Sequence, residues 1–223
     1  MHSISEKLSA TNARIRAAAA AAGRDPQDIT LIAVSKTKPV DDLEEAFAAG
    51  QRDFGENYVQ EAVQKITKLA HLDIHWHFIG AVQSNKTTLL AQHFDWVHTV
   101  CRVKIATRLA AHRTALNPLD ICLQVNIDDD SDKTGVAPGA VAPLLEQVCR
   151  LPSLRARGLM TILAKSGDPE SSFARLHELF RELAPIGGPN WDTLSMGMSQ
   201  DMDAAIANGA TALRIGSAIF GAR

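Results

Sequence analysis

Residues 29–50, ITLIAVSKTKPVDDLEEAFAAG, contain one complete strand–helix unit. Residues 29–34 form a short apolar run rich in β-branched residues, which is typical of a strand buried on both faces. Residues 40–49 follow as a helix, and Gly50 is a typical helix stop. Because the strand leads straight into the helix, this segment predicts the first half of a parallel βαβ unit.

The same alternation continues along the chain. We expect further strands at 52–54, 74–79, 96–100, 119–125, 154–161, 193–194 and 212–215. We expect helices at 4–22, 58–69, 85–92, 103–112, 140–149, 172–183, 201–207 and 217–220. About eight strands, each followed by a helix, fit a single closed (β/α)8 TIM barrel with an extra N-terminal helix. An open doubly wound sheet is the alternative.

Length and composition indicate one domain, residues 1–223, because no linker or low-complexity tract divides the chain. The formal net charge is −2, with 23 basic and 25 acidic residues, and aromatic residues make up 5%. This balance gives no reason to expect nucleic acid or a membrane as a partner. Three cysteines without CxxC spacing, and a start without the apolar core of a signal peptide, predict a cytoplasmic protein with reduced thiols.

Lys36 is the first candidate for chemistry, because it follows the strand at 29–34 and functional groups of such barrels lie where strands end. Desolvation at a barrel mouth lowers the pKa of a lysine and frees its amine to attack a carbonyl. From position alone, a lysine that extends into solvent is the more common case.

Two later strand ends suggest a phosphate site. Residues 194–201 read LSMGMSQD, where Gly197 allows a close backbone approach and Ser199 is a good helix N-cap. Residues 214–217 read RIGS and repeat the pattern of strand, glycine and hydroxyl. They follow the seventh and eighth strands, where barrels usually bind phosphate. Ordinary capped loops are the alternative, and for Arg214 a surface salt bridge.

Other polar residues lie near predicted strand ends. His75 and His77 fall on one face of a strand and could form half of a metal site, but no ligand cluster elsewhere completes it. Packed or hydrogen-bonded histidines are therefore the preferred interpretation, and we expect no metal. Asn57, after the second strand, adds a polar group to the rim, with helix capping as the alternative.

At these residues the sequence resembles a known family, the pyridoxal phosphate homeostasis proteins, also called the proline synthetase co-transcribed family. The matching stretches run in order along the chain: VSKTKP at 34–39, FGENYVQE at 54–61, HFIG at 77–80, QSNK at 83–86, QVN at 124–126, KTG at 133–135, GLMT at 158–161, LSMGMS at 194–199, RIGS at 214–217 and IFG at 219–221.

The resemblance implies a barrel like the N-terminal domain of alanine racemase, without that enzyme's second domain. It implies pyridoxal 5′-phosphate (PLP) bound as a Schiff base on Lys36. By the same match, Arg214 faces the pyridine nitrogen and keeps it unprotonated, which weakens the cofactor as an electron sink. The remaining implied cofactor-binding residues are Ser199, Gly216 and Ser217 for the phosphate, Asn57 near the ring, and His77 and Met160 lining the mouth less directly.

Three functions are compatible with this sequence. The first is a non-catalytic, monomeric PLP carrier in vitamin B6 homeostasis, with apo PLP-dependent enzymes as possible partners. The second is a PLP-dependent amino-acid racemase, which needs an acid–base group on each face of the substrate. Racemases of this type take a tyrosine from the missing domain, and the only tyrosine here, Tyr58, lies on a predicted helix. The third is a metal-dependent hydrolase built on His75 and His77.

Overall fold

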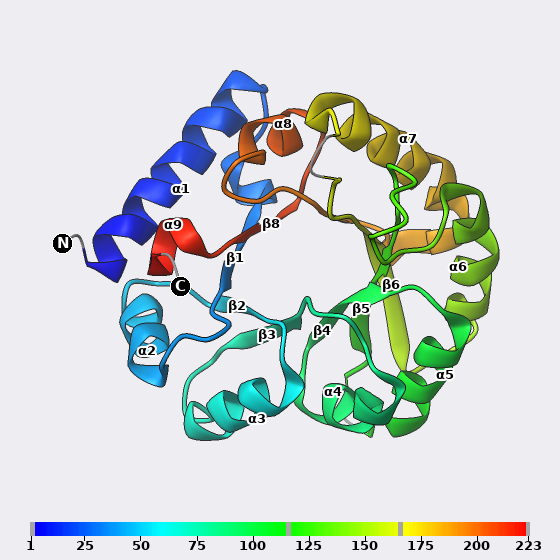
Figure 1. Ribbon diagram of the computed structural model, residues 1–223, viewed down its shortest axis with the longest axis horizontal. Coiled ribbons are helices and arrows are strands. Elements are labelled where there is room, and N and C mark those ends of the chain that lie inside the picture. Colours follow the sequence, from blue (N-terminus) through cyan, green and yellow to red (C-terminus); the bar gives the residue numbers. More distant parts are fainter. Residues whose placement is uncertain (1–2, 115–116, 165–166, 222–223) are drawn as a thin grey trace.

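The structure, a computed structural model, describes residues 3–114, 117–164 and 167–221. Within these residues, eight parallel strands pair in chain order and close into a barrel (Figure 1). The strands are β1 (Thr30–Val34), β2 (Asp53–Glu56), β3 (His75–Phe78), β4 (Trp96–Val100), β5 (Leu119–Gln124), β6 (Leu154–Met160), β7 (Thr193–Ser195) and β8 (Ala212–Ile215). The first and last strands pair directly, from Thr30 opposite Ala212 to Ala33 opposite Ile215. This closure confirms the TIM-barrel prediction and excludes the open sheet.

Helices surround the barrel, as Figure 1 shows. They are α1 (Ile4–Ala21), α2 (Val40–Ala48), α3 (Val59–Lys68), α4 (Thr87–His93), α5 (Val103–His112), α6 (Val141–Cys149), α7 (Pro169–Gly187), α8 (Met202–Ala207) and α9 (Ser217–Phe220). The additional helix α1 packs against α8 and α9, beside the strands that close the barrel. Its first turn is fixed by a capping box between Ser3 and Glu6.

Two helix boundaries differ from the sequence prediction for identifiable reasons. The helix expected at 85–92 begins with a short 3-10 turn, Ser84–Lys86, and becomes regular only at Thr87. Helix α7 begins earlier than expected, because the Asp168 side chain accepts from the N–H groups of Glu170 and Ser171 and Pro169 occupies the first turn.

Alternate strand residues face the barrel interior, and the others pack outward against the helices. In β1, Thr30 lines a cavity at the amino end of the barrel and Val34 lines another at the carboxyl end, with the fully buried Ile32 between them. The interior is not purely apolar, since it also contains His98 and Arg214. His98 lines the cavity at the amino end, and Arg214 lines the cavity at the carboxyl end.

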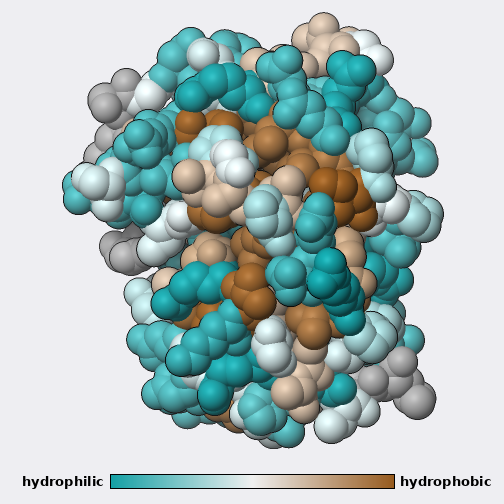
Figure 2. All heavy atoms as spheres, turned by 90° about the vertical axis from the view of Figure 1, so that its right-hand side faces the viewer, coloured by the Kyte–Doolittle hydropathy of each residue, from teal (hydrophilic) through white to brown (hydrophobic). Residues whose placement is uncertain are grey.

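Figure 2 shows the side formed by α5, α6 and α7, where hydrophobic residues appear in patches between hydrophilic ones. Within residues 3–114, 117–164 and 167–221, no helix combines the length and apolar character needed to cross a bilayer.

Candidate functional site

A cavity of about 400 Å³ opens at the carboxyl ends of the strands, and we refer to it as the C-terminal cavity. Binding sites of (β/α)8 barrels are found at this end. Its polar lining residues are Lys36, Lys38, Asn57, Ser199, Gln200, Asp201, Arg214 and Ser217. The rest of the wall is formed by Val34, Ile79, Ile162, Met198, Gly216 and Gly221.

Lys36 lies in a tight turn directly after β1. The N–H of Lys38 donates to the carbonyl oxygen of Ser35 over 3.0 Å. Thr37 has a φ of 64°, and its N–H donates to Glu61 Oε1 over 2.6 Å. Because a β-branched residue disfavours this left-handed conformation, hydrogen bonds rather than local preference hold the turn.

A buried ion pair lies next to this turn. Lys65 Nζ donates to Glu56 Oε1 and to the carbonyl oxygen of Ser35, each over 2.8 Å. It also lies 2.6 Å from Glu61 Oε1. Burial raises the pKa of Glu56, and the Lys65 ammonium group opposes that rise. The network therefore ties α3 to the residue that precedes Lys36.

Arg214 extends from β8 into the barrel and is 5% exposed. Its Nη1 donates to Ser195 Oγ over 2.8 Å, and its Nη2 donates to the carbonyl oxygen of Thr161 over 2.7 Å. Burial lowers the pKa of Arg214 to about 10, with the charge of Asp201 opposing, so the group remains charged at neutral pH. These bonds use two of the five N–H groups of a guanidinium, which leaves donors for a ligand in the C-terminal cavity.

The turns after β7 and β8 each contain a glycine at a position where a side chain would meet neighbouring atoms. Gly197 has a φ of 93°, and a Cβ there would come within 2.5 Å of the Ala205 Cβ. A Cβ on Gly216 would lie 3.2 Å from the carbonyl oxygen of Val34. A side chain at Gly197 would therefore clash with α8 and β8, and one at Gly216 would crowd the end of β1.

The expected helix cap at Ser199 is wrong. Helix α8 begins at Met202, with Asp201 preceding it, and Ser199 lies in the turn before them. Asp201 Oδ1 accepts instead from the N–H of Met198 over 2.6 Å, which tightens that turn. The carbonyl oxygen of Ser199 accepts from Arg14 Nη1 over 2.9 Å, so α1 supports the turn from outside.

Asn57 does not cap α3. Tyr58 occupies the position before the helix, and no side chain there bonds to the first turn. The Oδ1 atom of Asn57 is buried and has no hydrogen-bond partner among the described residues. Buried acceptors are nearly always satisfied, so an orphaned one on a cavity wall indicates a position where a ligand donates.

Six of the eight residues singled out from sequence line the C-terminal cavity, and His77 and Met160 do not. The expectation that these two residues line the mouth is wrong, and the reason is the same for both. Each faces the barrel interior but lies one layer too deep, since Ile79 and Ile162, two residues further along, are the ones that reach the cavity. Strand alternation gives the face of a residue and not its depth.

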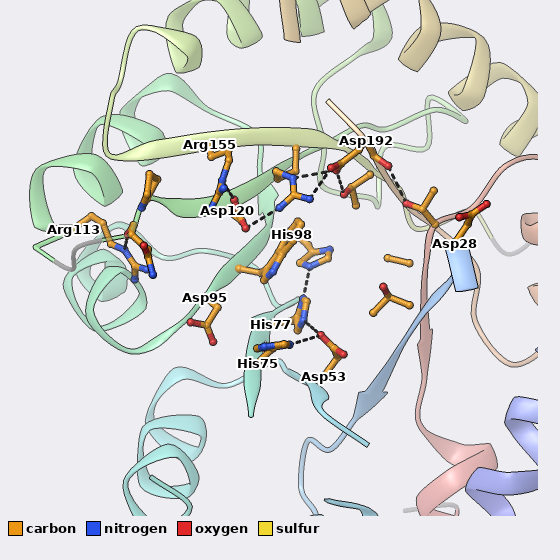
Figure 3. A pocket seen from close by; sticks show the side chains of 18 of the residues that line it. Asp28, Asp53, His75, His77, Asp95, His98, Arg113, Asp120, Arg155 and Asp192 are labelled. Atoms are coloured by element: carbon orange, nitrogen blue, oxygen red, sulfur yellow. Dashed lines mark hydrogen bonds and ion pairs between the residues drawn. The ribbon is translucent and has the colours of Figure 1, made fainter. Parts of the chain in front are cut away.

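His77 belongs to a second region, the N-terminal cavity, of about 740 Å³ at the amino ends of the strands (Figure 3). His75 and His77 both contact Asp53 Oδ1, over 3.2 and 3.0 Å, as expected for residues on one face. Arginine–aspartate pairs form another part of the wall, with Arg157 bridging Asp120 and Asp192 over 2.9 and 2.7 Å. No group of three or more His, Cys, Asp or Glu side chains in the described part of the chain is placed to hold a metal ion.

The sequence reasoning missed Lys65 and its partners. A signal was present, because Lys65 lies between Ala62 and Leu69 on the apolar stripe of its helix, where a charged residue is out of pattern. His98 gave no such signal, since a single histidine within an apolar strand is unremarkable.

Known proteins share the sequence and the fold of this chain. The family model described as "Alanine racemase, N-terminal domain" matches residues 7–223. A pyridoxal phosphate homeostasis protein of Pseudomonas aeruginosa is 54% identical over 100% of this chain and 97% of its own length. The protein of the same name from Escherichia coli K12 is 50% identical over 100% of this chain and 98% of its own. This chain belongs to the pyridoxal phosphate homeostasis protein family.

Solved structures agree with the family assignment. PipY of Synechococcus elongatus, solved without PLP, has a TM-score of 0.85 and 38% identity, and covers 98% of this chain and 100% of its own. A second PipY structure, described as having PLP bound, has a TM-score of 0.83. Alanine racemase of Clostridium difficile shares the fold alone, with a TM-score of 0.68 and 11% identity over 88% of this homeostasis-family chain and 53% of its own.

Proposed function

We propose that this chain binds PLP in the C-terminal cavity, covalently through Lys36, and serves PLP homeostasis without turning over amino acids. The observation that carries the proposal is the convergence of Lys36, Asn57 and Arg214 with the turns after β7 and β8 on one cavity. The PLP-bound structure of PipY and the names of the relatives support it.

The residues present fit such a cofactor. The cavity volume of about 400 Å³ lies within the range of small-molecule sites. The orphaned Asn57 Oδ1 offers an acceptor, and Arg214 offers buried donors. The glycine-containing turns follow the seventh and eighth strands, where barrels bind phosphate.

Each residue has a distinct role in this proposal. When bound, PLP would supply an aldehyde, with which the amine of Lys36 would condense with release of water. Arg214 would donate toward the ring nitrogen and, because it stays charged, would hold that nitrogen unprotonated. The phosphate is bound at the turns by Ser199, Gly216 and Ser217. Asn57 accepts a hydrogen bond beside the ring.

The same geometry favours a carrier over a racemase. Racemisation requires a second acid–base group opposite the lysine. Tyr58, the only tyrosine in the sequence, is 52% exposed and is not among the described residues that line the C-terminal cavity.

An absorbance and mass experiment tests the proposal. Protein mixed with PLP is expected to gain a visible absorption band that borohydride abolishes, and peptide mass mapping should then place the reduced adduct on Lys36. The Lys36→Ala variant should lose the adduct. Lys38→Ala is the matched comparison, because Lys38 lines the same cavity but directs its Nζ to the carbonyl oxygen of Phe220 over 3.1 Å. An adduct that survives in Lys36→Ala, or no adduct at all, rejects the proposal.

The proposal extends to how the protein works in the cell. It describes a single-domain, monomeric, cytoplasmic protein that passes PLP to apo-enzymes. Light scattering tests the monomer. Transfer is tested by mixing loaded protein with an apo-enzyme, where activation faster than by the PLP released into buffer supports it. Sustained conversion of an amino acid by the loaded protein alone would contradict a non-catalytic role.

A further inference from the structure

We propose that Arg214 is positioned by a hydrogen-bond relay that crosses the barrel interior and ends at the N-terminal cavity. The members of the relay are Ser195, His98, His77 and Asp53. Figure 3 shows the last three, at the N-terminal cavity. The inference rests on the proposed function only for the identity of the ligand that Arg214 contacts. It assigns a positioning role to four residues that lie outside the C-terminal cavity.

The relay is continuous at hydrogen-bond distances. Arg214 Nη1 lies 2.8 Å from Ser195 Oγ, and Ser195 Oγ lies 2.8 Å from His98 Nδ1. His98 Nε2 lies 3.0 Å from His77 Nδ1. His77 Nε2 then lies 3.0 Å from Asp53 Oδ1, at the start of β2. The chain of contacts therefore passes from β8 through β7, β4 and β3 to β2.

The relay has a defined direction in this proposal. A guanidinium only donates, so the Ser195 hydroxyl accepts from Arg214, and in the relay it gives its own hydrogen to His98 Nδ1. Neutral His98 then carries its hydrogen on Nε2 and donates to His77 Nδ1. By the same logic His77 donates from Nε2 to Asp53, because a carboxylate only accepts. The relay thus predicts that His77 and His98 each carry the donated hydrogen on Nε2 and accept at Nδ1.

Burial and charge favour this state. His98 has no exposed surface, and its burial, with the charge of Arg214 acting in the same direction, holds the pKa of His98 well below its usual value. Burial of Asp53 acts to raise its pKa, but its interactions with His77 and His75 outweigh this and lower it. His98 is therefore neutral and lies between the charged groups of Arg214 and Asp53.

Packing fixes the orientation of the two rings. His77 stacks on Trp96 with ring centroids 5.5 Å apart and an angle of 19° between the planes. Trp96 is covered in turn by the guanidinium of Arg157, which lies 4.6 Å from the ring centroid. His98 lies against the same Trp96 ring, with centroids 5.5 Å apart. Neither histidine ring can swing away without breaking its contact with Trp96. A change at Asp53 is therefore transmitted along the relay to Arg214.

His75 provides a matched control for each part of the relay. It contacts the same Asp53 oxygen from the same strand, but its side chain is 56% exposed and it has no contact with His98. A general disturbance around Asp53 would appear in His75→Gln. An effect transmitted through the relay would not.

The first experiment uses protein without PLP. Long-range ¹H–¹⁵N spectra of the histidine rings are expected to show the hydrogen on Nε2 in both His77 and His98. In Asp53→Asn the new amide can donate as well as accept, so part of the His98 population should carry its hydrogen on Nδ1, and the Arg214 side-chain signals should shift. His75→Gln should leave both unchanged. The hydrogen on Nδ1 of either ring in the wild type, or unchanged His98 and Arg214 signals in Asp53→Asn, would overturn the relay.

The second experiment uses PLP-loaded protein. His98→Phe removes both central bonds, and release of PLP is expected to become about tenfold faster, the effect of one lost hydrogen bond at a charged group. The visible band should also move, because the Arg214 contact changes. His75→Gln should match the wild type in rate and spectrum. If His98→Phe does not fold, Asp53→Asn is measured in the same way, and a wild-type rate and spectrum would reject the relay. Should the wild type bind no PLP while showing the expected tautomers, the proposed function fails and the relay stands.

Discussion

The ammonium nitrogen of Lys65 lies 2.8 Å from the backbone carbonyl oxygen of Ser35, the residue immediately before Lys36. A side chain from α3 therefore fixes the start of the turn that presents the candidate PLP-binding lysine. The same nitrogen pairs with the buried Glu56.

Replacement of Lys65 should destabilise the protein strongly. Loss of one partner from a buried ion pair usually costs about 3–5 kcal/mol. Because burial already raises the pKa of Glu56, that carboxyl group can take up a proton, so we expect about 3 kcal/mol for Lys65→Met. Urea unfolding measures the change. Lys68→Met, at an exposed position of the same helix, should change stability by less than about 0.5 kcal/mol. Equal effects of the two substitutions would contradict this view of the pair.

Asn57→Ala should separate stability from PLP binding. Removal of a buried acceptor that has no partner is expected to leave the PLP-free protein unchanged or to stabilise it by about 1 kcal/mol. PLP release should become about tenfold faster, since the ligand loses a hydrogen bond.

Asn126 is the comparison for Asn57, because its side-chain amide is satisfied on both sides by the backbone of Asp130. Asn126→Ala should destabilise by about 1 kcal/mol. Thermal unfolding without PLP gives both values. If Asn57→Ala destabilises the protein as much as Asn126→Ala does, the Oδ1 atom of Asn57 has a hydrogen-bond partner in solution.

Gly158 should not tolerate any side chain. A Cβ there would lie 1.7 Å from the carbonyl oxygen of Thr193, across the pairing of β6 with β7. Since neither strand can move without breaking the barrel, Gly158→Ala should destabilise by about 3 kcal/mol or more. Gly139→Ala has open space around the new methyl group and should be close to neutral. Chemical denaturation of both variants checks the contrast.

Stability should fall on mild acidification because of His98. In the unfolded chain a histidine has a pKa of about 6.5, whereas burial holds the pKa of folded His98 well below that value. Because the pKa of His98 is lower in the folded than in the unfolded protein, His98 stabilises the fold at pH values above its unfolded-state pKa. This stability is lost as the pH falls from the unfolded-state pKa toward the folded-state pKa. The loss attributable to His98 is up to about 1.4 kcal/mol per pH unit below 6.5.

Urea unfolding of PLP-free protein at pH 7, 6 and 5 measures this dependence. His98→Phe should show a shallower fall than the wild type. His71→Gln, at an exposed position, should follow the wild type. If His98→Phe and wild type lose stability in parallel, His98 is protonated in the folded protein, and the direction assigned to the relay would also be wrong.

The fold was predictable because each unit repeats the same local signals. Apolar runs such as 29–34 indicate a buried strand, and a glycine such as Gly50 indicates the end of the following helix. The boundary at Asp168 was missed although the aspartate–proline pair carries a cap signal. The 3-10 turn at Ser84–Lys86 has no comparable signal in the sequence.

The sequence indicated which strand ends form the candidate site, but not how deep in the barrel each residue lies. Lys36 and Arg214 meet because parallel strands bring their carboxyl ends together, whatever their separation in sequence. His77 was assigned to the wrong end, since the number of layers between a residue and the barrel mouth depends on the closed geometry. The contacts of His98 depend on that closure in the same way, and no spacing along the chain reveals them.

The pairing of β1 with β8 also has a consequence for protein synthesis. Lys36 leaves the ribosome before Arg214 and Gly216, because it precedes them by 178 and 180 residues along the chain. A nascent chain therefore carries the reactive amine long before it has the arginine and the turn that hold a ligand against it. If Lys36 binds the cofactor as proposed, only a chain whose β8 has been made and has paired with β1 can retain it, so retention reports that the barrel has closed.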